Sequence, residues 1–320
     1  MEEGSTRQAD GAIPWLLDGD PAIRWQTLRD LVGAPADVVA RNRSEVSRAG
    51  WASRLLALQD PDGNWGGGLY TPKWTSTTYS MLLLRDFGLP PDDPRAARAC
   101  DQLLERGLRP DGGINFGRSD RGETCITGMV GAILAYFNCD DDRLDTILRH
   151  LLAQQMPDGG WNCRRPFGAT HSSMHTTILA LEGLRQYEQR HGGELQEVRA
   201  AQLRGQEFLL IHRLFRSDRT GEIIKPEFTR FSFQPRWHYD ILRALDYLQS
   251  VRAPRDSRLE EAIGMVRGRR TEDGRWLLPQ AHRGESFFQL ESVGRPSRWN
   301  TLRALRVLAW WDSAVGRAPG

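Results

Sequence analysis

The sequence contains little lysine and little cysteine, and its charges nearly balance. Lysine occurs only at Lys73 and Lys225, so the other 41 of the 43 basic residues are arginine. The net charge is +2, and no excess of one sign points to nucleic acid or a membrane surface as a partner. Four cysteines in 320 residues do not make a disulfide framework, and a reducing compartment is expected.

Long hydrophobic runs are also missing. The longest, residues 126–137, is too short to span a bilayer and predicts a buried helix. Residues 1–10 are polar and lack the apolar core of a secretion signal, which favours a cytoplasmic protein. With 39% hydrophobic and 26% charged residues, the composition is that of a globular protein with a large core.

An internal repeat dominates what the sequence does contain. An Asp-Gly dipeptide followed by an aromatic or aliphatic residue recurs at intervals of 47 to 60 residues. The copies lie at residues 59–65, 110–114, 155–161 and 272–276, with a degenerate copy at 217–223. Asp-Gly predicts a tight turn with a positive φ at the glycine.

Each copy lies between two segments with helical periodicity. An amphipathic segment precedes it, at residues 51–58, 95–106 and 144–155. A more apolar segment follows it after a loop, at residues 77–87, 127–137, 176–184, 241–248 and 301–310. No strand-like alternation is present, so the sequence predicts an all-α chain of helical hairpins.

The first helix fits the same series. Residues 24–31 align with residues 298–305, with Arg, Trp, Thr, Leu, Arg and Leu matching. The N-terminal helix is therefore expected to be a sixth inner helix, and a ring of about six hairpins can close by packing it against the last. We predict one domain over residues 1–320, with an N-terminal tail at 1–20 and repeats over 22–312.

Metal-ligand residue types recur at one position of the repeat. Cys125, His175 and His238 occupy equivalent positions at the starts of inner helices, and Glu123 lies two residues before the cysteine. Thiolate, imidazole and carboxylate are ligands of zinc, and three of them leave the open coordination position of a catalytic site. We therefore predict a zinc site at Glu123, Cys125 and His175. His238 is a fourth ligand or a supporting partner, which Asp240 can orient.

Other cysteines and histidines give an alternative. Cys163 and His171 flank the third loop, so a site of Cys163, His171 and His175 is a second arrangement. Cys100 and Cys139 are expected in the core. His150, His191 and His282 are expected on the surface or in loops.

The repeat resembles a known superfamily. Its Gln-x-x-x-Asp-Gly-x-Trp pattern is similar to that of squalene–hopene cyclases and protein prenyltransferase β subunits, and the resemblance covers residues 22–311. It implies an α–α toroid whose inner helices surround a central cavity, with their N-terminal ends at its mouth. Class II terpene cyclases protonate substrate with Asp-x-Asp-Asp. The only acidic cluster here, residues 140–142, is interpreted as a helix cap, which disfavours that branch.

The prenyltransferase branch matches better. Glu123 and Cys125 resemble the first zinc-binding element of that family, and His175 resembles the second. Arg118 and Arg121 follow a Gly-Gly pair, as in the stretch that contacts diphosphate in the family. Two departures are Ile126, where the family has tyrosine, and residues 74–78, which lack the family's diphosphate-binding histidine. These weaken the prediction of a prenyl diphosphate more than that of a metal.

Aromatic residues at the inner-helix starts complete the predicted site. Together with Arg118 and Arg121, the expected substrate-binding residues are Trp25, Trp237, Tyr239 and Trp299. The predicted function is zinc-dependent, prenyltransferase-like transfer of an apolar group to a nucleophile, here a thiol. The resemblance also implies a helical partner subunit. No catalytic side chain is identified. The alternatives are a zinc-water hydrolase, lyase or terpene-cyclase-like enzyme, and a non-catalytic toroid that binds an apolar ligand or a protein.

Overall fold

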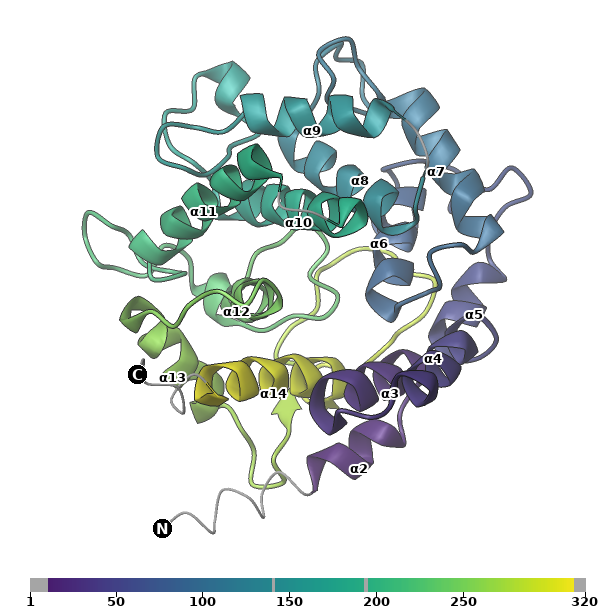
Figure 1. Ribbon diagram of the computed structural model, residues 1–320, viewed down its shortest axis with the longest axis vertical. Coiled ribbons are helices and arrows are strands. Elements are labelled where there is room, and N and C mark those ends of the chain that lie inside the picture. Colours follow the sequence, from purple (N-terminus) through teal and green to yellow (C-terminus); the bar gives the residue numbers. More distant parts are fainter. Residues whose placement is uncertain (1–10, 140–141, 193–194, 314–320) are drawn as a thin grey trace.

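The computed structural model describes residues 11–139, 142–192 and 195–313. Within these ranges the chain is mostly helical, as predicted, and Figure 1 shows the helices arranged around a ring. The inner helices are α3 (Pro21–Thr27), α6 (Thr77–Phe87), α8 (Thr124–Tyr136), α10 (Met174–His191), α12 (Ile241–Ser250) and α14 (Arg298–Ser313). The outer helices are α2 (Ala12–Leu17), α4 (Ala36–Ser44), α5 (Gly50–Leu56), α7 (Pro94–Gly107), α9 (Arg143–Ala153), α11 (Gln196–Ile211) and α13 (Glu260–Gly268).

Shorter elements connect these helices. A π-helical segment, Leu28–Val32, continues α3. Single 3₁₀ turns are at Glu45–Ser47, Arg165–Phe167, Pro226–Thr229 and Ser257–Leu259. The strands β1 (Trp276–Leu277) and β2 (Pro296–Ser297) form one short antiparallel pair. Helix α2 lies within the predicted tail, residues 1–20, and buries Leu16 in the core. None of the helices in the described ranges combines the length and apolar character that a bilayer crossing requires.

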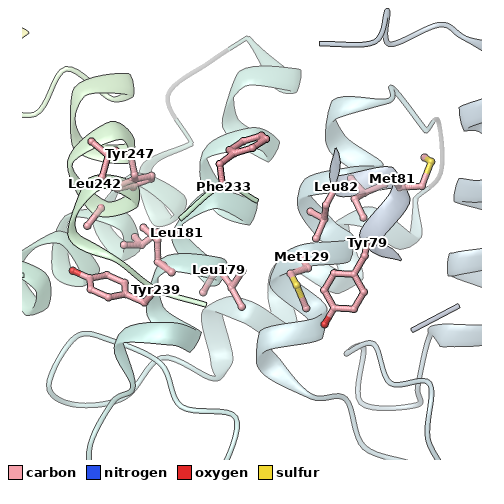
Figure 2. Packing of buried hydrophobic residues seen from close by; sticks show 14 of the residues in the cluster. Tyr79, Met81, Leu82, Met129, Leu179, Leu181, Phe233, Tyr239, Leu242 and Tyr247 are labelled. Atoms are coloured by element: carbon pink, nitrogen blue, oxygen red, sulfur yellow. The ribbon is translucent and has the colours of Figure 1, made fainter. Parts of the chain in front are cut away.

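The inner helices pack in chain order. Helix α3 contacts α6, α6 contacts α8, and α8 contacts α10, while α12 contacts α14. The last inner helix, α14, also contacts α3, so the two ends of the series meet. Figure 2 shows buried side chains of α6, α8, α10 and α12 converging between these helices. Helix α8 is buried on nearly all sides, which explains why its segment is apolar all round.

One pattern of hydrogen bonds ties each hairpin together. A buried threonine near the start of an inner helix accepts a hydrogen bond from the backbone N–H of the residue that ends the Asp-Gly motif. The pairs are Trp65–Thr77 (3.1 Å), Ile114–Thr127 (2.9 Å), Trp161–Thr177 (3.0 Å) and Trp276–Thr301 (3.0 Å). The indole N–H groups of the three tryptophans also donate to carbonyls of the preceding outer helices. These bonds satisfy carbonyls that a helix C-terminus leaves unpaired.

The Asp-Gly turns have the predicted conformation. Their glycines have positive φ, namely +92° at Gly63, +83° at Gly112, +91° at Gly159 and +75° at Gly274. This region is costly for a residue with a Cβ, which explains glycine at each copy.

Two long loops enter the ring interior (Figure 1). They are residues 225–240, before α12, and residues 278–295, before α14. The second loop reaches across the ring, where its Glu285 carbonyl accepts a hydrogen bond from the Trp74 backbone N–H (2.8 Å). The Trp74 indole donates to the carbonyl of Arg283 (2.8 Å), and a side chain at Gly284 would collide with this indole. Phe233 lines two cavities that lie among the described residues.

Candidate functional site

A thiol–carboxylate site, formed by Glu123, Cys125 and Cys163, lies at the start of α8. Glu123 immediately precedes the helix, Cys125 is its second residue, and Cys163 comes from the loop before α10. One ligand atom from each residue lies within 4.8 Å of the other two, and Cys125 Sγ lies 3.2 Å from Glu123 Oε1. The donors are of the types that zinc takes, and three of them leave one position of a tetrahedral site open.

The two thiols differ in acidity because they interact directly. The hydrogen bond from Cys125 lowers the pKa of the Cys163 thiol to about 7. The pKa of Cys125 is raised, because of its interaction with Cys163 and because it is buried. Cys163 is thus the more acidic thiol of the pair.

The predicted ligands His175 and His238 lie elsewhere. With His282 they form an imidazole cluster, in which the His238 ring stacks on that of His282 at 3.7 Å between centroids. The His175 and His238 centroids are 5.9 Å apart. Among the described residues, the structure therefore groups Glu123 and Cys125 with Cys163, and not with the two histidines.

A hydrogen bond fixes the tautomer of His175. Its Nδ1 accepts the backbone N–H of Tyr239 at 2.9 Å, so the neutral ring carries its proton on Nε2. A protonated nitrogen cannot ligate a metal, and burial lowers the pKa of His175 to about 4. This geometry suits a packed, neutral imidazole better than the zinc ligand predicted from the sequence.

The smaller cavity is an aromatic chamber of about 300 Å³ under the loop of residues 278–295. Helix α6 and the two interior loops provide its walls. Its aromatic side chains are Trp74, Tyr79, Phe233, Phe287 and Phe288. The thiol–carboxylate site lies close by, because its Cys125 and the chamber residue Tyr79 interact electrostatically.

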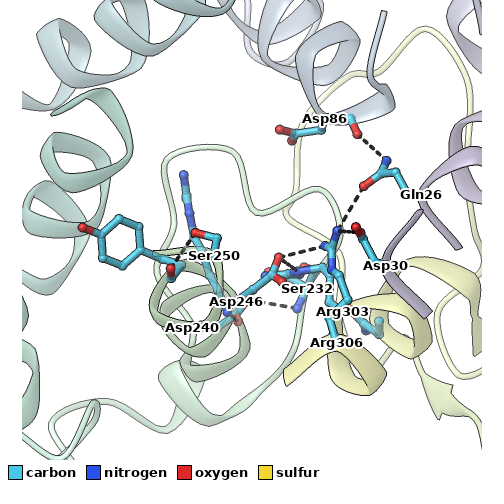
Figure 3. Close-up of polar contacts among 12 residues, drawn as sticks. Gln26, Asp30, Asp86, Ser232, Asp240, Asp246, Ser250, Arg303 and Arg306 are labelled. Atoms are coloured by element: carbon cyan, nitrogen blue, oxygen red, sulfur yellow. Dashed lines mark hydrogen bonds and ion pairs between the residues drawn. The ribbon is translucent and has the colours of Figure 1, made fainter. Parts of the chain in front are cut away.

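A hydrogen-bonded chain holds His282 at the chamber wall. His282 Nε2 lies 3.2 Å from Ser232 Oγ, which donates to Asp240 Oδ2 at 2.9 Å (Figure 3 shows Ser232 and Asp240). Because Ser232 gives its proton to Asp240, it accepts the Nε2 proton of His282. His282 Nδ1 is then an unprotonated acceptor, and burial lowers the pKa of His282 to about 4. Asp240 thus supports His282, whereas the sequence analysis paired it with His238.

The chamber also contains a carboxyl group and a guanidinium group. Glu291 is half-buried, accepts the backbone N–H of Arg298 at 2.6 Å, and its pKa is raised because of burial. The Arg236 guanidinium lies 4.4 Å from the centre of the Trp74 ring, and burial lowers its pKa to about 9. A carboxyl group, an imidazole and a guanidinium group therefore line the aromatic chamber together.

The predicted substrate-binding residues are dispersed. Arg118 and Arg121 are exposed in the loop before α8. Trp25 and Trp299 are buried and line the second cavity, not the aromatic chamber. Trp237 stacks on His238 at 3.7 Å, while Tyr239 is buried and donates to the Leu214 carbonyl at 2.6 Å.

Three residues were missed or misplaced by the sequence analysis. His150, expected on the surface or in a loop, is buried in α9 and bonded to the Asp111 carbonyl. His282 does lie in a loop, but that loop forms the chamber. Glu291 had no motif to signal it. Two of the three acidic cluster residues, 140 and 141, lie outside the described residues.

Comparisons with known proteins give structural neighbours only. No family model matches the chain, and no curated protein sequence matches it. A protein from Actinoplanes has a TM-score of 0.47 and 16% identity, with 97% of this chain and 99% of that chain covered. The type II terpene cyclase MstE from Scytonema, in its apo form, has a TM-score of 0.47 and 17% identity, with 97% and 98% covered. A variant of that cyclase in complex with its substrate geranylgeranyl dihydroxybenzoate also has a TM-score of 0.47 and 17% identity, with 97% of each chain covered.

Proposed function

We propose that this chain is an enzyme of terpene-cyclase-like type, which binds an apolar, isoprenoid-type molecule in the aromatic chamber and transfers protons to and from it. The observation that carries the proposal is the hydrogen-bonded chain from Asp240 through Ser232 to His282, which ends at the wall of this chamber. A fixed tautomer beside aromatic walls is typical of a general base in a binding pocket.

The chemistry follows from the environments of the two titratable groups. Burial raises the pKa of Glu291 and lowers the pKa of His282, which keeps its imidazole neutral. The two shifts bring the pKa values of the carboxyl group and the imidazole closer together. In the proposed reaction Glu291 gives a proton to the substrate and His282 Nδ1 removes one, giving a cyclised or isomerised product of the same composition.

The remaining walls select the ligand. The aromatic rings suit a prenyl chain, and their faces stabilise positive charge that develops on it. Arg236 provides a cation for a carboxylate or carbonyl group at one end of the molecule. A prenyl-substituted aromatic acid combines these features.

The test is incubation with geranyl- and farnesyl-substituted hydroxybenzoic acids, followed by mass spectrometry and chromatography for isomeric products. We expect conversion by the parent protein and a loss of at least about 100-fold in His282→Gln. His212→Gln is the matched control, because His212 lies at the end of α11 and bonds to the Arg216 carbonyl. If the parent protein neither bound nor converted any of these prenyl acids, the proposal would be refuted.

A second candidate, zinc-dependent group transfer to a thiol, is favoured by the thiol–carboxylate site. Glu123, Cys125 and Cys163 would hold the ion, and a bound zinc ion supplies Lewis acidity and keeps an incoming thiol as thiolate. Elemental analysis is expected to find zinc that is lost in Cys125→Ala and Cys163→Ala and kept in His175→Ala. Loss in His175→Ala but not in Cys163→Ala would restore the ligands predicted from the sequence, and protein without zinc would remove this candidate.

A further inference from the structure

The larger cavity, about 520 Å³, is an arginine chamber lined mainly by residues of the inner helices. Eight arginines and four carboxylates line it, and no lysine or histidine does. The excess of four positive charges is notable because the whole chain has a net charge of only +2. Figure 3 shows part of this polar lining, with Asp30, Asp246, Arg303 and Arg306 in contact.

Each carboxylate is already paired with an arginine. Glu182 accepts hydrogen bonds from Nε and Nη2 of Arg243, at 2.7 and 2.8 Å. Arg306 bridges Asp30 and Asp246, with both distances 3.0 Å. Asp86 is paired with Arg85 at 2.8 Å. All four carboxylates of the chamber are therefore paired with arginines that also line it.

Three arginines of the chamber form no ion pair within the described residues, namely Arg43, Arg185 and Arg252. Arg185 projects from α10 into the chamber. Its Nε is buried without a hydrogen-bond partner, and burial lowers the pKa of its guanidinium despite nearby carboxylates. A buried donor without an acceptor costs stability unless a ligand or water supplies one.

The helix dipoles do not remove the excess charge. The C-terminal ends of α6, α8 and α12 reach the chamber at Gly88, Tyr136 and Ser250. Each end carries about half a negative charge, so together they offset roughly one and a half of the four positive charges. A multiply charged anion would balance the remainder.

We infer that the arginine chamber is a binding site for a ligand that carries a multiply charged phosphate group, with Arg185 as a principal contact. Guanidinium forks match phosphate oxygens in geometry and in charge. The site is distinct from Arg118 and Arg121, which lie exposed in the loop at the N-terminal end of α8. Its occupancy does not depend on the reaction proposed for the aromatic chamber, so either proposal can fail alone.

Calorimetric titration of the full chain with inorganic diphosphate tests this inference. We expect saturable binding that Arg185→Gln weakens about 10- to 100-fold, the effect of losing hydrogen bonds to a charged group. Arg185→Lys keeps the positive charge but loses the planar guanidinium group with its paired N–H donors, so an intermediate affinity for diphosphate is expected. The double substitution Arg118→Gln and Arg121→Gln is the matched control, expected to bind as the parent does.

Thermal unfolding keeps the test independent of folding defects. Without ligand, Arg185→Gln should unfold at or above the parent temperature, because it removes an unpaired buried cation. With diphosphate, the parent should gain more stability than the variant. No diphosphate binding, equal binding in Arg185→Gln, binding lost only in the Arg118 and Arg121 variant, or citrate binding as tightly as diphosphate would each overturn the phosphate assignment.

Discussion

The candidate metal ligands show what repeat alignment predicts at the scale of the residue. Cys125 and His175 do occupy equivalent positions, at the starts of α8 and α10. Packed helices lie 8–10 Å apart, whereas ligands of one zinc ion lie within about 4 Å of one another. Equivalent positions on adjacent helices therefore need not share an ion. The third residue near Glu123 and Cys125 is Cys163, which comes from a loop whose path the repeat does not specify.

The imidazole cluster predicts a loss of stability in acid. Burial lowers the pKa of His238 to about 3, with further effects from His282, His175, Arg243 and Lys73. An unfolded histidine titrates near 6.5, so the unfolded state takes up protons first as the pH falls. We expect the thermal unfolding temperature to fall between pH 6.5 and 4. His238→Gln should reduce that fall, and identical pH profiles for parent and variant would contradict the assignment.

At the scale of the element, the inner helices were the most predictable part. Residues 77–87 were predicted and are observed as α6, and α12 extends the predicted 241–248 by two residues. Helices α10 and α14 extend beyond the predicted segments, residues 176–184 and 301–310, at both ends. The two interior loops could not be placed, because their position depends on contacts between segments far apart in the chain, such as that of Trp74 with Arg283.

The repeated threonine predicts how much each hairpin depends on one hydroxyl. Thr177 is fully buried and accepts the backbone N–H of Trp161 at 3.0 Å. Thr177→Val keeps the shape but leaves that N–H unpaired, so the free energy of unfolding should fall by about 1–3 kcal/mol. Chemical denaturation measures this. Thr177→Ser retains the hydroxyl and should lose less, while Thr220→Val, in an exposed turn, should change little.

At the scale of the whole molecule, the expectation of an apolar central cavity was wrong in part. The interior is divided between the aromatic chamber and the arginine chamber, with Phe233 between them. Ring closure at α3 and α14 was anticipated from the similarity of their sequences. The charges at that junction were not, because Arg306, Asp30 and Asp246 come from three different helical segments with no shared motif.

This junction gives a prediction for global stability. Arg306 is mostly buried and bridges Asp30 and Asp246. Arg306→Gln removes one partner from each carboxylate, while Asp30 keeps Arg29 and Asp246 keeps Arg303, so we expect a loss of about 1–3 kcal/mol in the free energy of unfolding. Arg267→Gln is the control, because Arg267 and Asp312 are about half exposed and such pairs contribute at most about 1 kcal/mol. Equal effects in the two variants would show that the bridge does not stabilise the ring.

The contact of Trp74 with residues 283 and 285 also bears on the order of folding. The two partners are about 210 residues apart in the chain. Contacts between such distant residues form late in folding, because closing the intervening loop has a large entropic cost. The aromatic chamber is thus completed only after the hairpins between them have formed. The Trp74 backbone amide, bonded to the Glu285 carbonyl, should become protected from hydrogen exchange later during refolding than the amides inside α8.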